Sequence, residues 1–276
     1  MKTILFPTDF SKNAVHASEY AGILIKQFDA NIVLLNVHWI PMVPENAMAY
    51  NAQEAIGDSK KEAEKDLAKF TEKFVEKTQI NPERISQRVE YGFPSDTIVE
   101  VANEIKADFI VMGTKGASDI LDKWLGTNAQ KVMKAAECPV WIIPADAVIN
   151  RPRKIMYAAD FKEDEILATQ RFLDIVKPLD ALCKVIHIND FFEQNGSNIT
   201  ETVSDLRGEF KEENLLVRNI KRADIIEGLE SYIDTFKPDT LALAVHEKSF
   251  FEKIFDTSVT KHFVQEAKLP ILTFRK

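Results

Sequence analysis

The sequence has few cysteines and no long apolar run, and each of these absences excludes a class of protein. The two cysteines, Cys138 and Cys183, lie far apart without a CxxC spacing. This argues against a disulfide framework or a zinc knuckle and favours a reducing, cytoplasmic compartment. No apolar stretch approaches the roughly 20 residues of a membrane-spanning helix. The opening MKTILFPTDF has too few apolar residues before Pro7 for a secretory signal.

Positive charge is also in short supply. The chain of 276 residues has a net charge of −8, and its lysines and arginines form no cluster. We therefore expect no binding to nucleic acid or to acidic membrane surfaces. Hydrophobic residues at 45% and charged residues at 28% are typical of a globular protein, and the length fits about two domains.

Motifs of catalysis are absent as well. The sequence contains no HExxH, no GxSxG and no GxxxxGK(S/T), so it predicts neither a catalytic metal, a hydrolase nucleophile nor a P-loop. Asp9 could act as a base, but no nucleophile with a partner stands beside it. His38 and His187 lie near the ends of equivalent strands, and we expect core or surface placement for both. No catalytic residue and no metal ligand are predicted.

One stretch, residues 108–143, favours binding of an anion. An apolar run, 108–112, leads into Gly113-Thr-Lys-Gly116, and Gly126-Thr127-Asn128 then opens a helical segment. Glycines let the backbone approach phosphate oxygens, and the first amides of a helix are unpaired donors at its positive end. The alternative is an ordinary strand-to-helix turn with a helix cap and no ligand.

The rest of the chain alternates between short apolar runs and segments with helical spacing. Runs at 2–8, 31–38 and 85–90 predict strands, and helical periodicity covers 14–28, 58–77 and 95–106. This alternation predicts an α/β fold, with a parallel sheet and helices on both faces. We expect 39–57, which contains Pro41, Pro44 and Gly57, to be a mobile connection that covers a site.

The second half of the chain repeats the first. Segment 154–161 repeats 2–10 with Asp160 in place of Asp9, 182–189 repeats 32–39, 238–244 repeats 107–113, and 269–274 repeats 138–143. Two copies of one domain are therefore predicted, 1–146 and 152–276, joined by a proline-punctuated segment.

The glycines are not repeated. Ala244, Glu247 and Thr257 stand where the first copy has Gly113, Gly116 and Gly126, and Ala158-Ala159 replaces Pro7-Thr8. A carboxylate at position 247 would repel phosphate. Since the fold occurs without these glycines, we infer that they serve a ligand, and that the anion site exists in the first domain only.

Together these residues resemble the universal stress protein family. The resemblance rests on Pro7-Thr8-Asp9 after the first strand, Val37 near the end of the second, the Gly-x2-Gly-x9-Gly-Thr motif of Gly113, Gly116, Gly126 and Thr127, and Cys-Pro-Val before the last strand. With the repeat, the chain resembles the tandem two-domain form. The resemblance implies two doubly wound, adenine-nucleotide-hydrolase-like (Rossmann-like) domains, each with a five-stranded parallel sheet.

The resemblance also implies ATP as the ligand and a role for each motif residue. Pro7, Thr8 and Asp9 would contact adenosine, the backbone of Val37 would face the adenine edge, Gly113 and Gly116 would line the ribose and α-phosphate, and Gly126, Thr127 and Asn128 would hold the β- and γ-phosphates. Asn128 departs from the family pattern, in which a Val or another small residue is common. Asp119 and Asp122 could hold Mg²⁺ or weaken phosphate binding, although we expect them to be solvent-exposed.

The implied function is an ATP-binding stress-response regulator. ATP would order the loop 113–126 of the first domain and change a surface offered to an unknown protein partner, with at most slow hydrolysis. The last strands, 140–143 and 271–274, are expected to pair the two halves within the chain, and a homodimer stays open. The alternatives are a slow ATPase and an interaction protein that binds no nucleotide.

Overall fold

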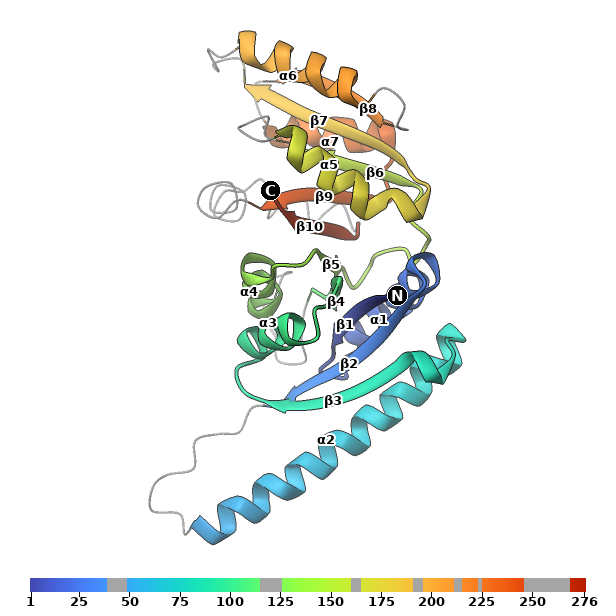
Figure 1. The fold of residues 1–276 in the computed structure, drawn as a ribbon, viewed down its shortest axis with the longest axis vertical. Coiled ribbons are helices and arrows are strands. Elements are labelled where there is room, and N and C mark those ends of the chain that lie inside the picture. The colour runs from blue at the N-terminus through green and yellow to red at the C-terminus, as the bar shows by residue number, and fades with distance from the viewer. Residues whose placement is uncertain are drawn as a thin grey trace. The chain divides into compact units, whose positions relative to one another are not determined.

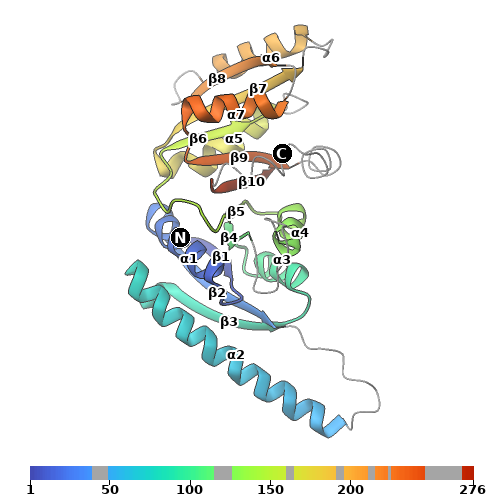
Figure 2. The same ribbon diagram turned by 180° about the vertical axis from the view of Figure 1, so that it is seen from behind.

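The computed structural model describes residues 1–38, 49–114, 126–159, 165–190, 196–210, 215–222, 225–245 and 269–276. The chain divides into two compact units, Met1–Ala145 and Asp146–Lys276 (Figures 1 and 2). Each unit contains parallel strands alternating with helices, as the sequence predicts.

The described residues of the first unit form a parallel sheet in the order β3-β2-β1-β4-β5. Its strands are β1 (Lys2–Pro7), β2 (Ala30–His38), β3 (Ile85–Tyr91), β4 (Phe109–Gly113) and β5 (Val140–Ile143). Its helices are α1 (Lys12–Phe28), α2 (Ala49–Thr78), α3 (Pro94–Glu104) and α4 (Thr127–Ala135), with a 3-10 turn at Pro82–Arg84. Helix α1 packs on α2, and α3 packs on α4. This is the two-faced arrangement that right-handed crossovers produce.

The two central strands of this sheet set the position of a site. Residues 4–6 of β1 and 109–111 of β4 are at most 1% exposed, as expected for parallel strands covered on both faces. From β1 the chain crosses to β2, whereas from β4 it crosses to β5 on the opposite side. Strand order therefore reverses between β1 and β4, and ligands of open α/β sheets bind at the carboxyl ends of the strands at such a point.

The described residues of the second unit repeat this arrangement in the order β8-β7-β6-β9-β10. Its strands are β6 (Lys154–Ala158), β7 (Leu182–Asp190), β8 (Leu215–Arg222), β9 (Thr240–Val245) and β10 (Ile271–Arg275). Its helices are α5 (Glu165–Val176), α6 (Gly196–Glu209) and α7 (Ile225–Phe236), with a 3-10 turn at Lys177–Leu179.

The same hydrogen bonds hold both sheets at their amino ends. In the first unit, Asp108 donates its amide to the carbonyl of Thr3 (2.8 Å), and its Oδ2 accepts from the amide of Thr3 (2.8 Å). In the second unit, Asp239 donates to the carbonyl of Lys154 (2.9 Å) and accepts from the amide of Lys154 (3.1 Å). Asp239 is therefore the counterpart of Asp108, and Lys154 that of Thr3.

The register of the second strand differs from the sequence comparison by one residue. The amide of Thr8 donates to the carbonyl of Leu35 (2.8 Å), and that of Ala159 to the carbonyl of Ile186 (2.9 Å). Leu182 is thus the counterpart of residue 31, so the predicted match of 182–189 to 32–39 is wrong. A strand buried on both faces has an apolar run in which a shift of one residue still pairs apolar with apolar.

The predicted connection at 39–57 is wrong in its second half. Helix α2 begins at Ala49 and continues through Gly57 to Thr78 as one 30-residue helix, which extends past the carboxyl end of β3 (Figure 1). Gly57 indicated a break, yet a single glycine costs a helix only about 1 kcal/mol and the surrounding sequence is rich in helix formers. Residues 39–48 lie outside the described part of the chain.

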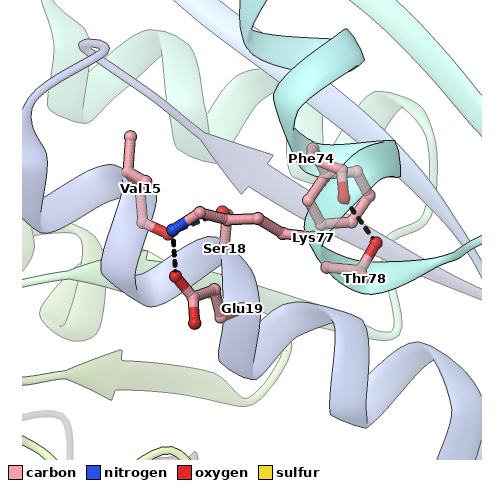
Figure 3. A network of polar contacts seen from close by, with 6 residues as sticks. All are labelled: Val15, Ser18, Glu19, Phe74, Lys77 and Thr78. Carbon is pink, nitrogen blue, oxygen red and sulfur yellow. Dashed lines mark hydrogen bonds and ion pairs between the residues drawn. The ribbon is translucent and has the colours of Figure 1, made fainter.

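Helices α1 and α2 approach closely at Gly22. A Cβ atom at this position would lie 2.5 Å from Cγ2 of Thr78. Figure 3 shows the surrounding contacts: Nζ of Lys77 lies 2.5 Å from Oε1 of Glu19, and Thr78 donates its hydroxyl to the carbonyl of Phe74 (2.7 Å). Because this hydroxyl is bonded within its own helix, Thr78 is held in a fixed rotamer against Gly22.

We therefore expect Gly22→Ala to destabilise the first unit by about 1–3 kcal/mol, because overpacking outweighs the better helix propensity of alanine. The matched control is Gly57→Ala in α2, where an added Cβ meets nothing within 4 Å. This control should leave stability unchanged or raise it by up to about 1 kcal/mol. Urea unfolding followed by tryptophan fluorescence measures the effect, since Trp39, Trp124 and Trp141 all belong to the first unit. Equal stabilities of the two variants would contradict the close contact.

Candidate functional site

The segment after β1 is fixed by a set of short-range hydrogen bonds. Thr8 is 6% exposed, and its carbonyl accepts from Nδ2 of Asn36 (2.8 Å) on the neighbouring strand. Oδ1 of Asp9 accepts from the amide of Ser11 (3.1 Å), and Oγ of Ser11 accepts from the amide of Ala14 (3.1 Å), so that Ser11 caps α1. These bonds hold the exposed side chain of Asp9 at the carboxyl edge of the sheet.

Phe10 takes a left-handed conformation within this segment, with φ of 62°. A non-glycine residue pays an energetic cost there, so the surroundings must impose the conformation. The amide of Phe10 donates to Oγ1 of Thr8 (3.0 Å), and its ring lies 6.0 Å from that of Phe70 in α2. The turn between β1 and α1 is therefore fixed by a hydrogen bond to Thr8 and by ring packing against α2.

The end of β4 continues this edge of the sheet. The amide of Thr114 donates to the carbonyl of Ile143 (3.2 Å), and the carbonyl of Thr114 accepts from the amide of Gly126 (2.5 Å). Gly126 is the N-cap of α4 and provides no side-chain acceptor for the first amides of that helix. Thr127 and Asn128 follow as exposed residues of its first turn. A helix start of this kind presents amide donors to an anion.

Asn13 connects the two segments. Its Nδ2 donates to Oγ1 of Thr114 (3.3 Å), across the point where strand order reverses. A Cβ atom at Gly113 would lie 3.1 Å from both Cγ and Nδ2 of Asn13. Sequence reasoning missed Asn13 because it belongs to no recognised motif. The available signal was its place in the first turn of a helix that follows a site strand.

The end of β2 contributes Val37 and His38. Val37 is half-buried and pairs in register with Glu90 of β3. Nε2 of His38 lies 2.7 Å from Oγ of Ser59 in α2. The rings of His38 and Tyr91 pack edge to face, with their centroids 6.1 Å apart. These contacts give His38 a structural role in joining β2 to α2 and β3.

The structure thus places most predicted site residues at one edge of the first unit. Pro7 ends β1, with Thr8 and Asp9 directly after it, and Gly113 ends the adjacent β4. Val37 lies near the end of β2, Gly126 caps α4, and Thr127 and Asn128 begin that helix. Gly116, Asp119 and Asp122 lie outside the described residues. In the part of the chain that the structure describes, no three His, Cys, Asp or Glu side chains gather as metal ligands.

The cysteines do not offer a reactive thiolate. Burial raises the pKa of Cys138 to about 11, with the charges of Asp108 and Glu137 adding to the shift. Cys183 is buried, and its thiol donates to the carbonyl of Ala181 (3.5 Å). Reactive cysteines have depressed rather than raised pKa values. None of the helices in the described part of the chain has the length and apolar character needed to cross a membrane.

The fold and this edge of the sheet define a doubly wound α/β protein with a candidate site in its first unit. Residues 1–144 match the model of the universal stress protein family, and the chain belongs to this family. This confirms the resemblance noted from the sequence motifs.

Relatives by sequence cover one unit of the chain. A universal stress protein of Methanocaldococcus jannaschii is 32% identical over 154 residues, which are 55% of this chain and 84% of the relative. Another, of Synechocystis, is 31% identical over 143 residues, or 52% of this chain and 85% of the relative.

Relatives by structure cover both units. The crystal structure of a universal stress protein from Archaeoglobus fulgidus superposes with a TM-score of 0.73 and 19% identity, over 99% of this chain and 96% of that one. A protein of unknown function from Pseudomonas aeruginosa superposes with a TM-score of 0.59 and 14% identity, over 100% and 92%. These likenesses confirm the α/β class and the tandem two-domain fold.

We expect the raised pKa of Cys138 to suppress its alkylation. At pH 8 a thiol of pKa about 11 is ionised at least a hundredfold less than an unperturbed one of about 8.5. In a Cys183→Ser variant, reaction with iodoacetamide should be slower than in the urea-unfolded chain by about that factor. The rate should keep rising with pH as the pH approaches the raised pKa. A rate that levels off below pH 9 would contradict the burial of this thiol.

Proposed function

We propose that the first unit binds an adenine nucleotide, ATP in the first instance, and acts as a nucleotide-linked stress-response regulator. The observation that carries this proposal is the glycine cap of α4, at the carboxyl end of β4 and bonded to Thr114. The cap leaves the first amides of a nine-residue helix without a side-chain acceptor at the edge where α/β sheets bind ligands.

The proposed roles follow the order of the residues along this edge. Pro7, Thr8 and Asp9 would contact adenosine, and the backbone of Val37 the adenine edge. Gly113 and Gly116 would line the ribose and α-phosphate, and Gly126, Thr127 and Asn128 the β- and γ-phosphates. Mg²⁺ would accompany the triphosphate, as is usual for ATP.

The second unit supports the restriction of this site to the first. At the counterpart of Ala14 the second unit has Glu165, which is 3% exposed. Its Oε1 accepts from the hydroxyl of Tyr157 (2.7 Å), and its Oε2 lies 3.0 Å from Nζ of Lys276. This end of the second unit is thus filled by an internal, paired charge, and we assign the second unit a structural or regulatory role.

The proposed mechanism is a shift between conformations. A ligand changes a protein's conformation only to the extent that it binds one state more tightly than the other. Phosphate contacts to the α4 amides would order the segment from Gly113 to Gly126 and so change a surface that is presented to a protein partner. No described side chain is placed as a general base with a nucleophile, so we expect any hydrolysis to be slow. Neither cysteine forms a disulfide bond, which fits the cytoplasmic location we propose.

Calorimetric titration with ATP, AMP and adenosine tests the proposal. Wild type should bind ATP saturably, and Gly126→Glu should weaken binding by about a hundredfold or more, since it places a carboxylate against the phosphates. The matched control is Thr257→Glu, which changes the position that the repeat sets opposite Gly126 and should bind as wild type does. Circular dichroism checks that each variant is folded. Absence of saturable binding to wild type, or equal affinity in Gly126→Glu, would refute the proposed function.

A further inference from the structure

We propose that Asn13 is a positioning residue that sets the phosphate-binding end of the site, through Thr114 and Gly126. This inference rests on the proposed nucleotide site and names a residue, outside the glycine motif, that gives the site its geometry. It rests on the fixed position of Asn13 in the capped first turn of α1, on its contact with Thr114 at the end of β4, and on the hydrogen bond between Thr114 and Gly126 at the start of α4.

Asn13 projects from a fixed piece of backbone. It lies in the first turn of α1, which Ser11 caps through the amide of Ala14 (3.1 Å). The amide of Val15 donates to the carbonyl of Ser11 (3.0 Å). The helix start is tied in turn to Asp9 by the bond from the amide of Ser11 (3.1 Å). The carboxamide of Asn13 is therefore presented from the same segment that would contact adenosine.

The contact of Asn13 with the end of β4 involves two consecutive residues. Nδ2 donates to Oγ1 of Thr114 at 3.3 Å, and Cγ and Nδ2 of the carboxamide would lie 3.1 Å from a Cβ at residue 113, a tight contact. Glycine at 113 is what allows this approach, because a larger residue would push the carboxamide away from Thr114. Gly113 thus has a partner within the protein as well as a proposed contact with the nucleotide.

Thr114 is also hydrogen-bonded to the residue that caps α4. It is 3% exposed, and its carbonyl accepts from the amide of Gly126 (2.5 Å). Gly126 is the residue from which the α4 amides begin. Both residues that flank segment 115–125 are consequently held relative to α1, and the orientation of Thr114 influences where the helix start lies.

The second unit shows that these residues change together. Matching hydrogen bonds show which residues of the two units correspond. Around β6 the counterpart of a first-unit residue lies 151 positions later, as Ala159 does for Thr8, and around β9 it lies 131 positions later, as Asp239 does for Asp108. By this correspondence Asp164, Ala244 and Val245 replace Asn13, Gly113 and Thr114. Valine has no hydroxyl to accept the hydrogen bond, and alanine carries the Cβ that Gly113 lacks.

The test uses the full chain and a double-mutant cycle of Asn13→Ala and Thr114→Val, with Thr114→Ser to retain the hydroxyl. Each single variant should weaken ATP three- to tenfold, the usual range for one hydrogen bond, and should leave adenosine within about twofold. The double variant should lose no more than either single one, because both remove the same interaction. Thr114→Ser should restore wild-type affinity. The control Lys12→Ala, at the exposed neighbour of Asn13 in α1, should change nothing.

A second measurement needs no ligand. Hydrogen exchange of the Gly126 amide should be faster in Asn13→Ala and Thr114→Val than in wild type and Lys12→Ala. Additive losses in the cycle, equal losses for ATP and adenosine, or unchanged exchange at Gly126 would overturn the positioning role. If wild type binds no nucleotide, the proposed function fails while exchange at Gly126 still decides whether Asn13 holds this end of the site.

Discussion

The parallel pairing of β1 with β4 is the constraint on which the first unit depends. Ile4 lies opposite Phe109 and Leu5 opposite Ile110. Asp108 fixes this register by exchanging hydrogen bonds with Thr3 at the amino end. The register decides that Thr8 and Thr114 emerge at the same edge, where a side chain from the first turn of α1 can reach both segments. The second unit keeps the same lock through Asp239, so the fold is preserved where the proposed site is not.

Much of this arrangement was predictable because it rests on signals that are local in sequence. Apolar runs such as Phe109–Met112 and the helical spacing of 14–28 indicate their elements directly, and the internal repeat indicates two domains. The predicted site residues after β1 and β4 converge because the carboxyl ends of parallel strands share one edge of the sheet.

The features that sequence reasoning missed depend on tertiary contacts. Asn13 acquires its importance only when α1 packs over β4, and no spacing in the sequence announces that contact. The alignment of 182–189 with the first unit could be determined only from the hydrogen bond between Ala159 and Ile186, because either of the two possible alignments pairs apolar residues with apolar residues. The helical start at Ala49 was hidden by Gly57, which lies in a part of α2 with room for a side chain and therefore reflects no packing demand.

The two units have different side chains at the carboxyl ends of their central strands. In the second unit Glu165 and Lys276 form an ion pair whose side chains are 2% and 4% exposed, with the hydroxyl of Tyr157 completing the carboxylate's bonds. Removing one member of such a pair leaves an uncompensated buried charge, a loss of about 3–5 kcal/mol. The pair therefore ties α5 to the residue that follows β10.

Not every glycine of the motif is equally strong evidence for a bound nucleotide. The contrast between the copies indicated that Gly113, Gly116 and Gly126 serve a ligand, since the fold forms without them. Gly113 has a second explanation, because a Cβ there would lie only 3.1 Å from the carboxamide of Asn13, and the second unit replaces both residues. Gly126 is the N-cap of α4, provides no side-chain cap, and donates its amide to the carbonyl of Thr114. Of the three glycines, Gly126 stands closest to the proposed phosphate contacts, at the start of a helix whose first amides attract an anion.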